Sequence, residues 1–299
     1  MSRQYDEHHR SVMIHEALHY LLSKQEGGLY FDCTAGEGGH IRAILEATKG
    51  LSRVVGLDVD REVLELAERN LKDYQGCFQL FNLSYANFEI VLRQLGVTKV
   101  DGFLLDVGVS TFQLKSLGRG FSYDIDEPLD MRMDLSRELT AERVVNGYSE
   151  KDLARIIFEY GEEQRFARKI ARSIISRRPL YSTKDLVEAI KKAIPPAERY
   201  KRKSHFATRT FQAIRIEVND ELENIEKALR AIPCYLNPGG RVVIISFHSL
   251  EDGIAKRVFR EKMDIELKIL TKKPLLPSKD EIDLNLRARS ARLRAAERI

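Results

Sequence analysis

Short apolar runs alternate with amphipathic stretches along the first third of the chain. Four runs rich in β-branched and aromatic residues lie at 29–31, 53–59, 77–83 and 100–107. Runs of this length and composition are typical of buried strands, and the stretches between them, such as 61–70, have apolar residues at helical spacing. Strands that alternate with helices predict a parallel sheet with a binding site at the carboxyl ends of its strands.

The last third of the chain predicts the rest of this sheet. A Pro-Gly-Gly turn at 238–240 leads into an apolar run that ends at Ser246 and predicts a fifth strand. Residues 266–271 and 289–296 predict two closing strands. We therefore expect an α/β fold with a mostly parallel, seven-stranded sheet.

The alternation of strands and helices stops near Ser116. Residues 117–134 are loop-like, and helical patterns dominate after them, at 140–146, 149–159, 162–176, 183–193 and 207–230. We expect residues 116–212 to form an all-helical domain inserted between the fourth and fifth strands. Residues 1–115 and 213–299 would then form the sheet domain.

A glycine cluster directly follows the first predicted strand. The sequence Asp32-Cys-Thr-Ala-Gly-Glu-Gly-Gly-His40 contains Gly36, Gly38 and Gly39. Glycines allow the positive φ angles of a tight turn, and a helix that begins after them turns its first backbone N–H groups toward an anionic or polar ligand. The spacing is not the full dinucleotide fingerprint, so a glycine turn without a ligand is the alternative.

Acidic residues end the second and fourth predicted strands. Asp58 lies 20 residues beyond Gly38, where a carboxylate would accept hydrogen bonds from ribose hydroxyls, and Asp106 ends the fourth strand. Phe88 follows the third strand, where its ring would either stack on an adenine or pack in the core. Because the carboxyl ends of parallel strands share one edge, these residues and Asp32 would gather there.

Composition narrows the class of protein. The chain has 299 residues, of which 43% are hydrophobic and 31% charged, as in soluble globular proteins. It has no apolar stretch of membrane-spanning length and no signal-peptide core, so we expect a cytoplasmic protein without a membrane partner. Cys33, Cys77 and Cys234 form no C-x-x-C pair, so we expect neither disulfides nor a metal site.

Basic residues gather in three tracts. The net charge of +4 indicates no partner by itself, but residues 165–178 and 199–209 contain no acid, and residues 287–298 contain one. Such tracts favour a polyphosphate partner such as RNA, with a solvated helix face as the alternative for each tract. We expect Arg165, Arg168 and Arg209 to bind phosphates.

Several longer motifs occur in a fixed order along nearly the whole chain. The most specific are Pro128-Leu-Asp-Met-Arg-Met133 and Ile245-Ser-Phe-His-Ser-Leu-Glu-Asp252, and others lie at 9–16, 32–40, 104–110, 119–123, 207–213 and 287–297. Together they resemble the MraW family, the S-adenosylmethionine-dependent cytosine-N4 methyltransferases of bacterial small-subunit ribosomal RNA. The chain departs from the family pattern at Ser11, usually proline, and at Thr111, usually serine.

The resemblance implies a Rossmann-like class I methyltransferase fold and S-adenosylmethionine as the cofactor. It implies cofactor contacts at Gly38, Gly39, His40, Asp58, Phe88, Asp106 and Gln113. Of these, His40 and Gln113 come from the resemblance alone. The implied partner is small-subunit ribosomal RNA or the assembled small subunit, and the oligomeric state is open, a homodimer included.

Methyl transfer to an exocyclic amine needs a group that localises the nitrogen lone pair and takes up its proton. Many amino-methyltransferases have a proline-containing motif for this after the fourth strand, whereas this chain has Asp106-Val-Gly-Val-Ser110. We expect Asp106 to fill the role, assisted by Ser246 or His248. His248 fits a structural cap of the loop after the fifth strand equally well.

The substrate base is expected to meet Arg119, Asp130 and Arg132. For Asp130 and Arg132 the alternative is that they only brace the insertion.

Other functions explain fewer of these residues. A carbon-5 methyltransferase needs a cysteine nucleophile, but Cys234 precedes the fifth strand and Cys33 lies in the cofactor strand. A nicotinamide oxidoreductase explains the glycine turn and Asp58, but not Asp32 or the basic insertion. A methyltransferase for another RNA base and a non-catalytic RNA-binding module are the remaining alternatives, and the module leaves the gathered acids unexplained.

Overall fold

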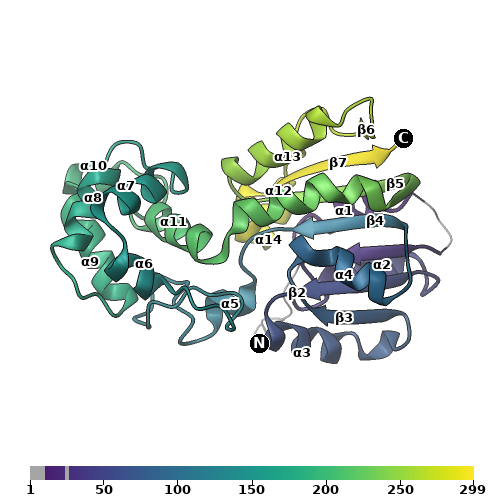
Figure 1. The fold of residues 1–299 in the computed structure, drawn as a ribbon, viewed down its shortest axis with the longest axis horizontal. Helices are drawn as coiled ribbons and strands as arrows, with labels where there is room; N and C mark the ends of the chain where they lie inside the picture. The colour runs from purple at the N-terminus through teal and green to yellow at the C-terminus, as the bar shows by residue number, and fades with distance from the viewer. Residues whose placement is uncertain (1–10, 24–26) are drawn as a thin grey trace. The chain divides into compact units, whose positions relative to one another are not determined.

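The computed structural model describes residues 11–23 and 27–299. His9 and Arg10 of the first family motif, and the start of a helix that the pattern of residues 8–22 predicts, lie outside the described residues. The chain divides into two compact units (Figure 1). The first runs to Gly108 and resumes at Leu222, and the second comprises Val109–Glu221, wider at both ends than the predicted insertion of residues 116–212.

A seven-stranded sheet forms the centre of the first unit, in the order β3-β2-β1-β4-β5-β7-β6. Its strands are β1 (Leu29–Asp32), β2 (Arg53–Asp58), β3 (Phe78–Asn82), β4 (Val100–Asp106), β5 (Leu236–Ser246), β6 (Leu267–Ile269) and β7 (Arg292–Arg298). The first five strands are parallel, and β7 is antiparallel to both β5 and β6. The predicted Rossmann-like, mostly parallel sheet is therefore confirmed.

Both faces of this sheet are buried. Neighbouring residues on a strand point to opposite faces, and accordingly Phe31 and Phe103 lie in one core cluster, whereas Tyr30 and Leu104 lie in another. The helices of this unit are α1 (Ile14–Leu21), α2 (Gly39–Ala47), α3 (Arg61–Asn70), α4 (Phe88–Gln94), α12 (Glu221–Ala231), α13 (Ser249–Glu261) and α14 (Lys279–Leu284). Helices α4, α12 and α13 contribute to the first cluster, and α1 and α2 to the second.

The second unit has its own hydrophobic core, and its regular elements are helices. They are α5 (Thr111–Lys115), α6 (Ala141–Gly147), α7 (Glu150–Glu159), α8 (Ala167–Ile175), α9 (Thr183–Ala193), α10 (Pro196–Tyr200) and α11 (Thr208–Asn219). Several begin at serine or threonine caps: the Ser149 and Ser182 side chains accept hydrogen bonds from the N–H groups of Asp152 and Asp185. Of the described residues, no helix has both the length and the apolar character to cross a bilayer.

Two predicted helices differ from the observed ones because of left-handed residues. The pattern of residues 207–230 predicts one helix, but Asp220 has φ +51° and separates α11 from α12. The Asp220 carboxylate forms an ion pair with Arg137 that holds this break. Likewise Glu162 has φ +51°, and α8 begins only at Ala167.

A buried ion pair attaches α13 to β7. The Nε of Arg294 lies 2.6 Å from Oδ1 of Asp252, and its NH2 group lies 3.1 Å from Oδ2. Both residues are buried, and Arg292 is a more distant partner at 3.7 Å. The last acid of the Ser-Phe-His-Ser-Leu-Glu-Asp motif is therefore structural.

Replacing Arg294 with Met should lower the free energy of unfolding by about 3–5 kcal/mol, because a buried carboxylate loses its main partner. Lys268→Met is the matched control, since Lys268 is exposed and 4.0 Å from Glu297, and it should change stability by less than about 1 kcal/mol. Urea unfolding measures both. Equal losses for the two variants would contradict this role of the Asp252–Arg294 pair.

Candidate functional site

The glycine turn after β1 forms the floor of the candidate site. Gly36 has φ +51° and Gly38 has φ +87°, and Gly38 is the residue before α2. A Cβ on Gly38 would lie 3.0 Å from the Leu71 side chain, and one on Gly39 only 2.0 Å from Oγ of Ser11. The positive φ of Gly38 therefore favours glycine, and a side chain on Gly39 would displace Ser11. Among the described residues no side chain caps the first N–H groups of α2, which leaves them available to a ligand.

Asp58, at the end of β2, fixes this turn. Its Oδ2 accepts a hydrogen bond from the Gly36 N–H, and its Oδ1 accepts one from the Asp60 N–H, both at 2.9 Å. Burial raises the pKa of Asp58 to about 6, although these two hydrogen bonds lower it and the charges of Asp60 and Asp32 raise it further. The carboxylate keeps unused lone pairs for ribose hydroxyls.

Asp32, His40 and Asp106 come together beside the turn. Asp32 is fully buried, and its Oδ1 accepts from the Thr34 N–H at 3.1 Å while its Oδ2 has no partner within the described part of the chain. Nε2 of His40 lies 3.4 Å from Oδ2 of Asp106, whose Oδ1 is also buried without a partner. The Asp106 N–H donates to Oγ1 of Thr34 at 2.7 Å, so one threonine connects the ends of β1 and β4.

The protonation of this cluster is finely balanced. Burial raises the pKa of Asp32 to about 6, against the opposing charge of His40 and the hydrogen bond from Thr34. Burial by itself lowers the pKa of His40, but the hydrogen bond and charge of Asp106, with the charges of Asp32 and Glu281, raise it overall. Among residues 11–23 and 27–299, the acids therefore face few cations and hydrogen-bond donors, which favours a cationic ligand.

Two residues of this neighbourhood were not predicted as site residues. Thr34 lies inside the Asp32–His40 motif, but nothing in its pattern singles it out. Arg287 comes from the C-terminal segment: burial lowers its pKa, while the charges of Asp106 and Glu37 raise it, so its guanidinium lies within their electrostatic reach. Its place in the motif at 287–297 was the only signal.

Phe88 lies in the core. Its side chain has no exposed surface, and its ring packs edge-on against Phe103 and Tyr235 at centroid distances of 5.0 and 5.3 Å. The ring has no free face for an adenine. The structure therefore corrects the stacking prediction in favour of the core alternative.

Ser246 and His248 are engaged in the loop after β5. The Ser246 hydroxyl donates to the Arg292 carbonyl of β7 at 3.2 Å. His248 precedes α13, and its Nε2 lies 2.9 Å from Oε1 of the fully buried Glu251. The other Glu251 oxygen accepts from the N–H groups of Phe247 and His248 at 2.7 and 3.2 Å. These contacts fit the structural alternative, and a direct catalytic role for either residue stays a prediction.

Gln113 lies in the second unit. Its Oε1 accepts from the Ser110 N–H at 3.0 Å, and its own N–H donates to Oγ of Ser110 at 3.1 Å, so the two residues form a capping box at the start of α5. The cofactor contact implied for Gln113 is untested.

Arg119, Asp130 and Arg132 brace the loop that precedes α6. The buried Arg119 donates to the carbonyls of Arg132 and Met133 at 3.0 and 3.2 Å. Arg132 makes a bidentate pair with Asp130 at 2.9 and 2.7 Å. The bracing alternative accounts for the Asp130–Arg132 pair, and the burial of Arg119 argues against the base contact predicted for it.

The arginines predicted to bind phosphates differ in whether their guanidinium groups are already paired within the protein. Arg165 pairs with Glu198 at 2.6 Å, and Arg209 donates to the Glu162 carbonyl at 3.1 Å and lies 3.8 Å from Glu163. Arg168 is exposed and has no ion pair within the described part of the chain. Of the three, Arg168 is the best placed to receive a phosphate.

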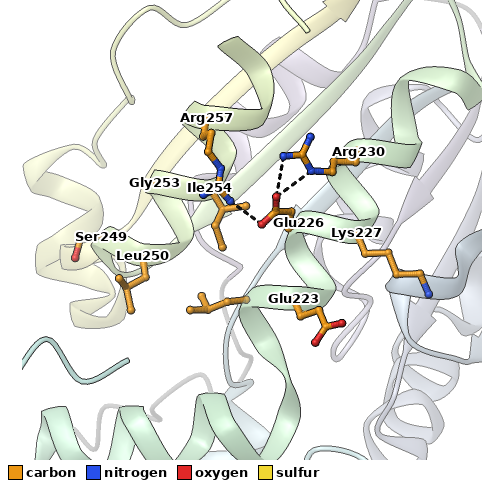
Figure 2. A pocket seen from close by; sticks show the side chains of 10 residues that line it. Glu223, Glu226, Lys227, Arg230, Ser249, Leu250, Gly253, Ile254 and Arg257 are labelled. Atoms are coloured by element: carbon orange, nitrogen blue, oxygen red, sulfur yellow. Dashed lines mark hydrogen bonds and ion pairs between the residues drawn. The ribbon is translucent and has the colours of Figure 1, made fainter. Parts of the chain in front are cut away.

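A groove of about 820 Å³ lies between α12 and α13 (Figure 2). Glu226 projects into it and pairs with Arg230 at 2.8 Å and with Arg257 at 2.6 Å. None of the carboxyl-edge acids lines it, and its main charges are neutralised by one another. We therefore place the candidate site at the strand ends and not in this groove. Within residues 11–23 and 27–299, no cluster of His, Cys, Asp and Glu has metal-binding geometry.

Comparison with known proteins decides the family. The model of the MraW methylase family matches residues 6–299. This chain belongs to the MraW methylase family. The ribosomal RNA small subunit methyltransferase H of Kosmotoga olearia is 64% identical over 299 residues, which cover all of both chains. That of Thermotoga neapolitana is 55% identical and covers 99% of this chain and 97% of its own.

A solved structure of a putative rRNA-methylase from Clostridium thermocellum covers 98% of this chain and all of its own, at 9% identity and a TM-score of 0.48. At this similarity it adds nothing to the family assignment.

The cofactor of this MraW methylase is S-adenosylmethionine, and the site fits it. The cofactor has a positive sulfonium and ammonium, and the unpartnered oxygens of Asp32 and Asp106 are buried beside the glycine turn. Asp58 presents a carboxylate for hydroxyl groups, and the first backbone N–H groups of α2 have no side-chain cap within the described residues.

The affinity for S-adenosylmethionine should rise from about pH 5 to about pH 7, with a midpoint near the raised pKa of about 6 of Asp32 and Asp58. The cofactor binds the ionised form of these carboxyls. At pH 5 a carboxyl with a pKa of about 6 is mostly protonated, so the free energy needed to remove its proton should weaken binding about tenfold for each such carboxyl. Without cofactor the sign is opposite: between about pH 4 and 6 the native state binds more protons than the unfolded state, so stability falls as the pH rises.

Isothermal titration calorimetry across this range measures the affinity. Asp32→Asn should weaken binding at pH 7 and flatten the profile, whereas Asp73→Asn, at an exposed position, should leave both unchanged. An affinity independent of pH in the wild-type protein would contradict the interpretation.

Proposed function

We propose that this protein transfers a methyl group from S-adenosylmethionine to the exocyclic N4 amine of a cytidine in bacterial small-subunit ribosomal RNA. The observation that carries the proposal is the pair of acids at the ends of β1 and β4, Asp32 and Asp106, each with one buried oxygen that has no partner within the described part of the chain, beside Asp58 at the end of β2. The relatives named ribosomal RNA small subunit methyltransferase H support the choice of RNA. The cytosine-N4 target follows from the resemblance of the motifs.

The first unit is proposed to hold the cofactor through backbone and carboxylates. The turn at Gly36, Gly38 and Gly39 lets a ligand approach the first turn of α2. Asp58 would accept from the ribose hydroxyls, and Asp32 would balance positive charge. His40, held by Asp106, would close the same side of the site.

Asp106 is proposed as the group that activates the acceptor amine. Bound S-adenosylmethionine supplies an electrophilic methyl group on sulfur, so the carbon–sulfur bond breaks as the carbon–nitrogen bond forms, and the nitrogen then loses one proton. The free Oδ1 of Asp106 would accept a hydrogen bond from the amine and take up this proton. The hydrogen bond from its N–H to Thr34 holds the Asp106 backbone in place.

Ser246 and His248 are proposed to assist through the loop after β5. Their contacts with Arg292 and Glu251 fix this loop at the carboxyl edge. They would help to position the substrate and would not take up the proton of the amine. The second unit is proposed as the RNA-recognition domain, with small-subunit RNA or the assembled subunit as its partner. A cytoplasmic location follows from that partner.

Incubation with small-subunit RNA, or with subunits from a strain lacking the enzyme, followed by mass-spectrometric mapping should find one N4-methylcytidine. Asp106→Asn should lower kcat by about 10²- to 10⁴-fold, as loss of a general base does, beyond any weakening of cofactor binding, which calorimetry measures separately. Cys234→Ala should be fully active, because Cys234 lies before β5.

A methyl group on carbon 5 or on another base would contradict the amine assignment. Detection of RNA binding without methylation of RNA or subunits would favour the non-catalytic module.

A further inference from the structure

Two basic tracts that lie far apart in the sequence meet on one surface of the second unit. The ring of Phe166 is the meeting point: Arg165 and Lys169 lie over it at 5.2 and 5.8 Å, and Arg202 lies over it at 5.7 Å. Ion pairs fix the same junction, from Arg165 to Glu198 and from Arg202 to the buried Glu163, each at 2.6 Å.

The acids of this junction serve as internal counterions. Glu163 is 1% exposed and Glu198 22%, so they hold Arg165 and Arg202 in place and present little negative surface. Lys169 and Lys203 are exposed and have no ion pair within the described part of the chain. The junction is thus preorganised, while these lysines are available for a partner.

An aromatic column continues the surface beyond the lysines. The rings of Tyr123 and His205 are parallel, at a centroid distance of 4.5 Å and an interplanar angle of 12°. The ring of His205 lies 4.2 Å from that of Phe206, over which Arg199 sits at 5.6 Å. Behind the column, Tyr123 meets the edge of the buried Phe211, so the column is anchored in the core.

The position of the His205 imidazole selects its tautomer. Nδ1 accepts a hydrogen bond from the Ala207 N–H at 3.3 Å, so Nε2 has the proton in the neutral ring. His205 is exposed overall, but partial desolvation of its ring lowers its pKa against the opposing charge of Asp124, which favours the neutral ring. The imidazole therefore offers an uncharged N–H donor from a segment that also carries Lys201, Arg202 and Lys203.

We propose that the exposed side of α8 around Phe166 and residues 199–206 form one RNA-backbone-binding surface. In it, Lys169 and Lys203 contact phosphates of the same RNA molecule, and Nε2–H of His205 donates to a backbone oxygen. The inference rests on the proposed function for the identity of the partner. The combination fits RNA, because clustered cations recognise phosphates and neutral donors recognise phosphate or 2′-hydroxyl oxygens.

Filter binding of small-subunit ribosomal RNA separates these roles. It is measured from about 50 to about 200 mM salt, the range over which contacts to phosphates lose much of their affinity. Lys169→Gln and Lys203→Gln should each reduce the slope of log affinity against log salt by about 1, and the double variant by about 2. His205→Phe keeps the aromatic column but lacks the donor. It should weaken binding several-fold with the slope unchanged.

Lys192→Gln, at an exposed lysine of α9 outside this surface, is the matched control and should bind as the wild type does. All variants should bind S-adenosylhomocysteine normally and should match the wild-type circular dichroism and thermal unfolding, which together show that both units are folded. If Lys169→Gln or Lys203→Gln leaves the slope unchanged, the two tracts do not share one RNA. If His205→Phe leaves affinity unchanged, the donor role is wrong. Both failures differ from failure of the proposed function, in which the wild-type protein neither binds nor methylates this RNA.

Discussion

The burial of acids at the carboxyl edge of the sheet is the constraint on which the site depends. Asp32 is fully enclosed, and its raised pKa of about 6 means that its ionised form costs on the order of 3 kcal/mol at neutral pH. A positively charged ligand beside Asp32 would offset this cost, in addition to the charge of His40. The cofactor-free site is thus suited to a cationic cofactor.

The strand order creates this arrangement. Because β1 lies between β2 and β4, the residues that follow the three strands must meet, and the glycine turn fills the space among them. Thr34 and Asp58 then fix the geometry, since each connects the turn to a neighbouring strand end by a hydrogen bond of 2.7–2.9 Å. The second unit has its own core, so the surface that we propose for RNA is built independently of the cofactor cradle.

The sequence predicted the features that depend on local pattern. Strand periodicity, the glycine turn and the acids at Asp58 and Asp106 are readable because strand ends in a parallel sheet converge. Features that depend on tertiary packing could not be predicted from the sequence. An aromatic residue after a strand, such as Phe88, can pack in the core or contact a ligand, and only its neighbours Phe103 and Tyr235 decide between the two roles. The break at Asp220 was missed because the moderate preference of Asp for the left-handed region is a weak signal inside a continuous helical pattern. The bracing role of Arg119 depends on carbonyls 13 and 14 residues away.

Proton release on cofactor binding tests the central claim most directly. Titration calorimetry at pH 6, repeated in buffers of different ionisation enthalpy, counts the protons that leave the protein when S-adenosylmethionine binds. With two carboxyls each about half protonated at that pH, the wild-type protein should release up to about one proton, and Asp32→Asn should release about half as many. Binding of S-adenosylmethionine without any proton release would show that the acids at the strand ends are not held partly protonated for a cationic ligand.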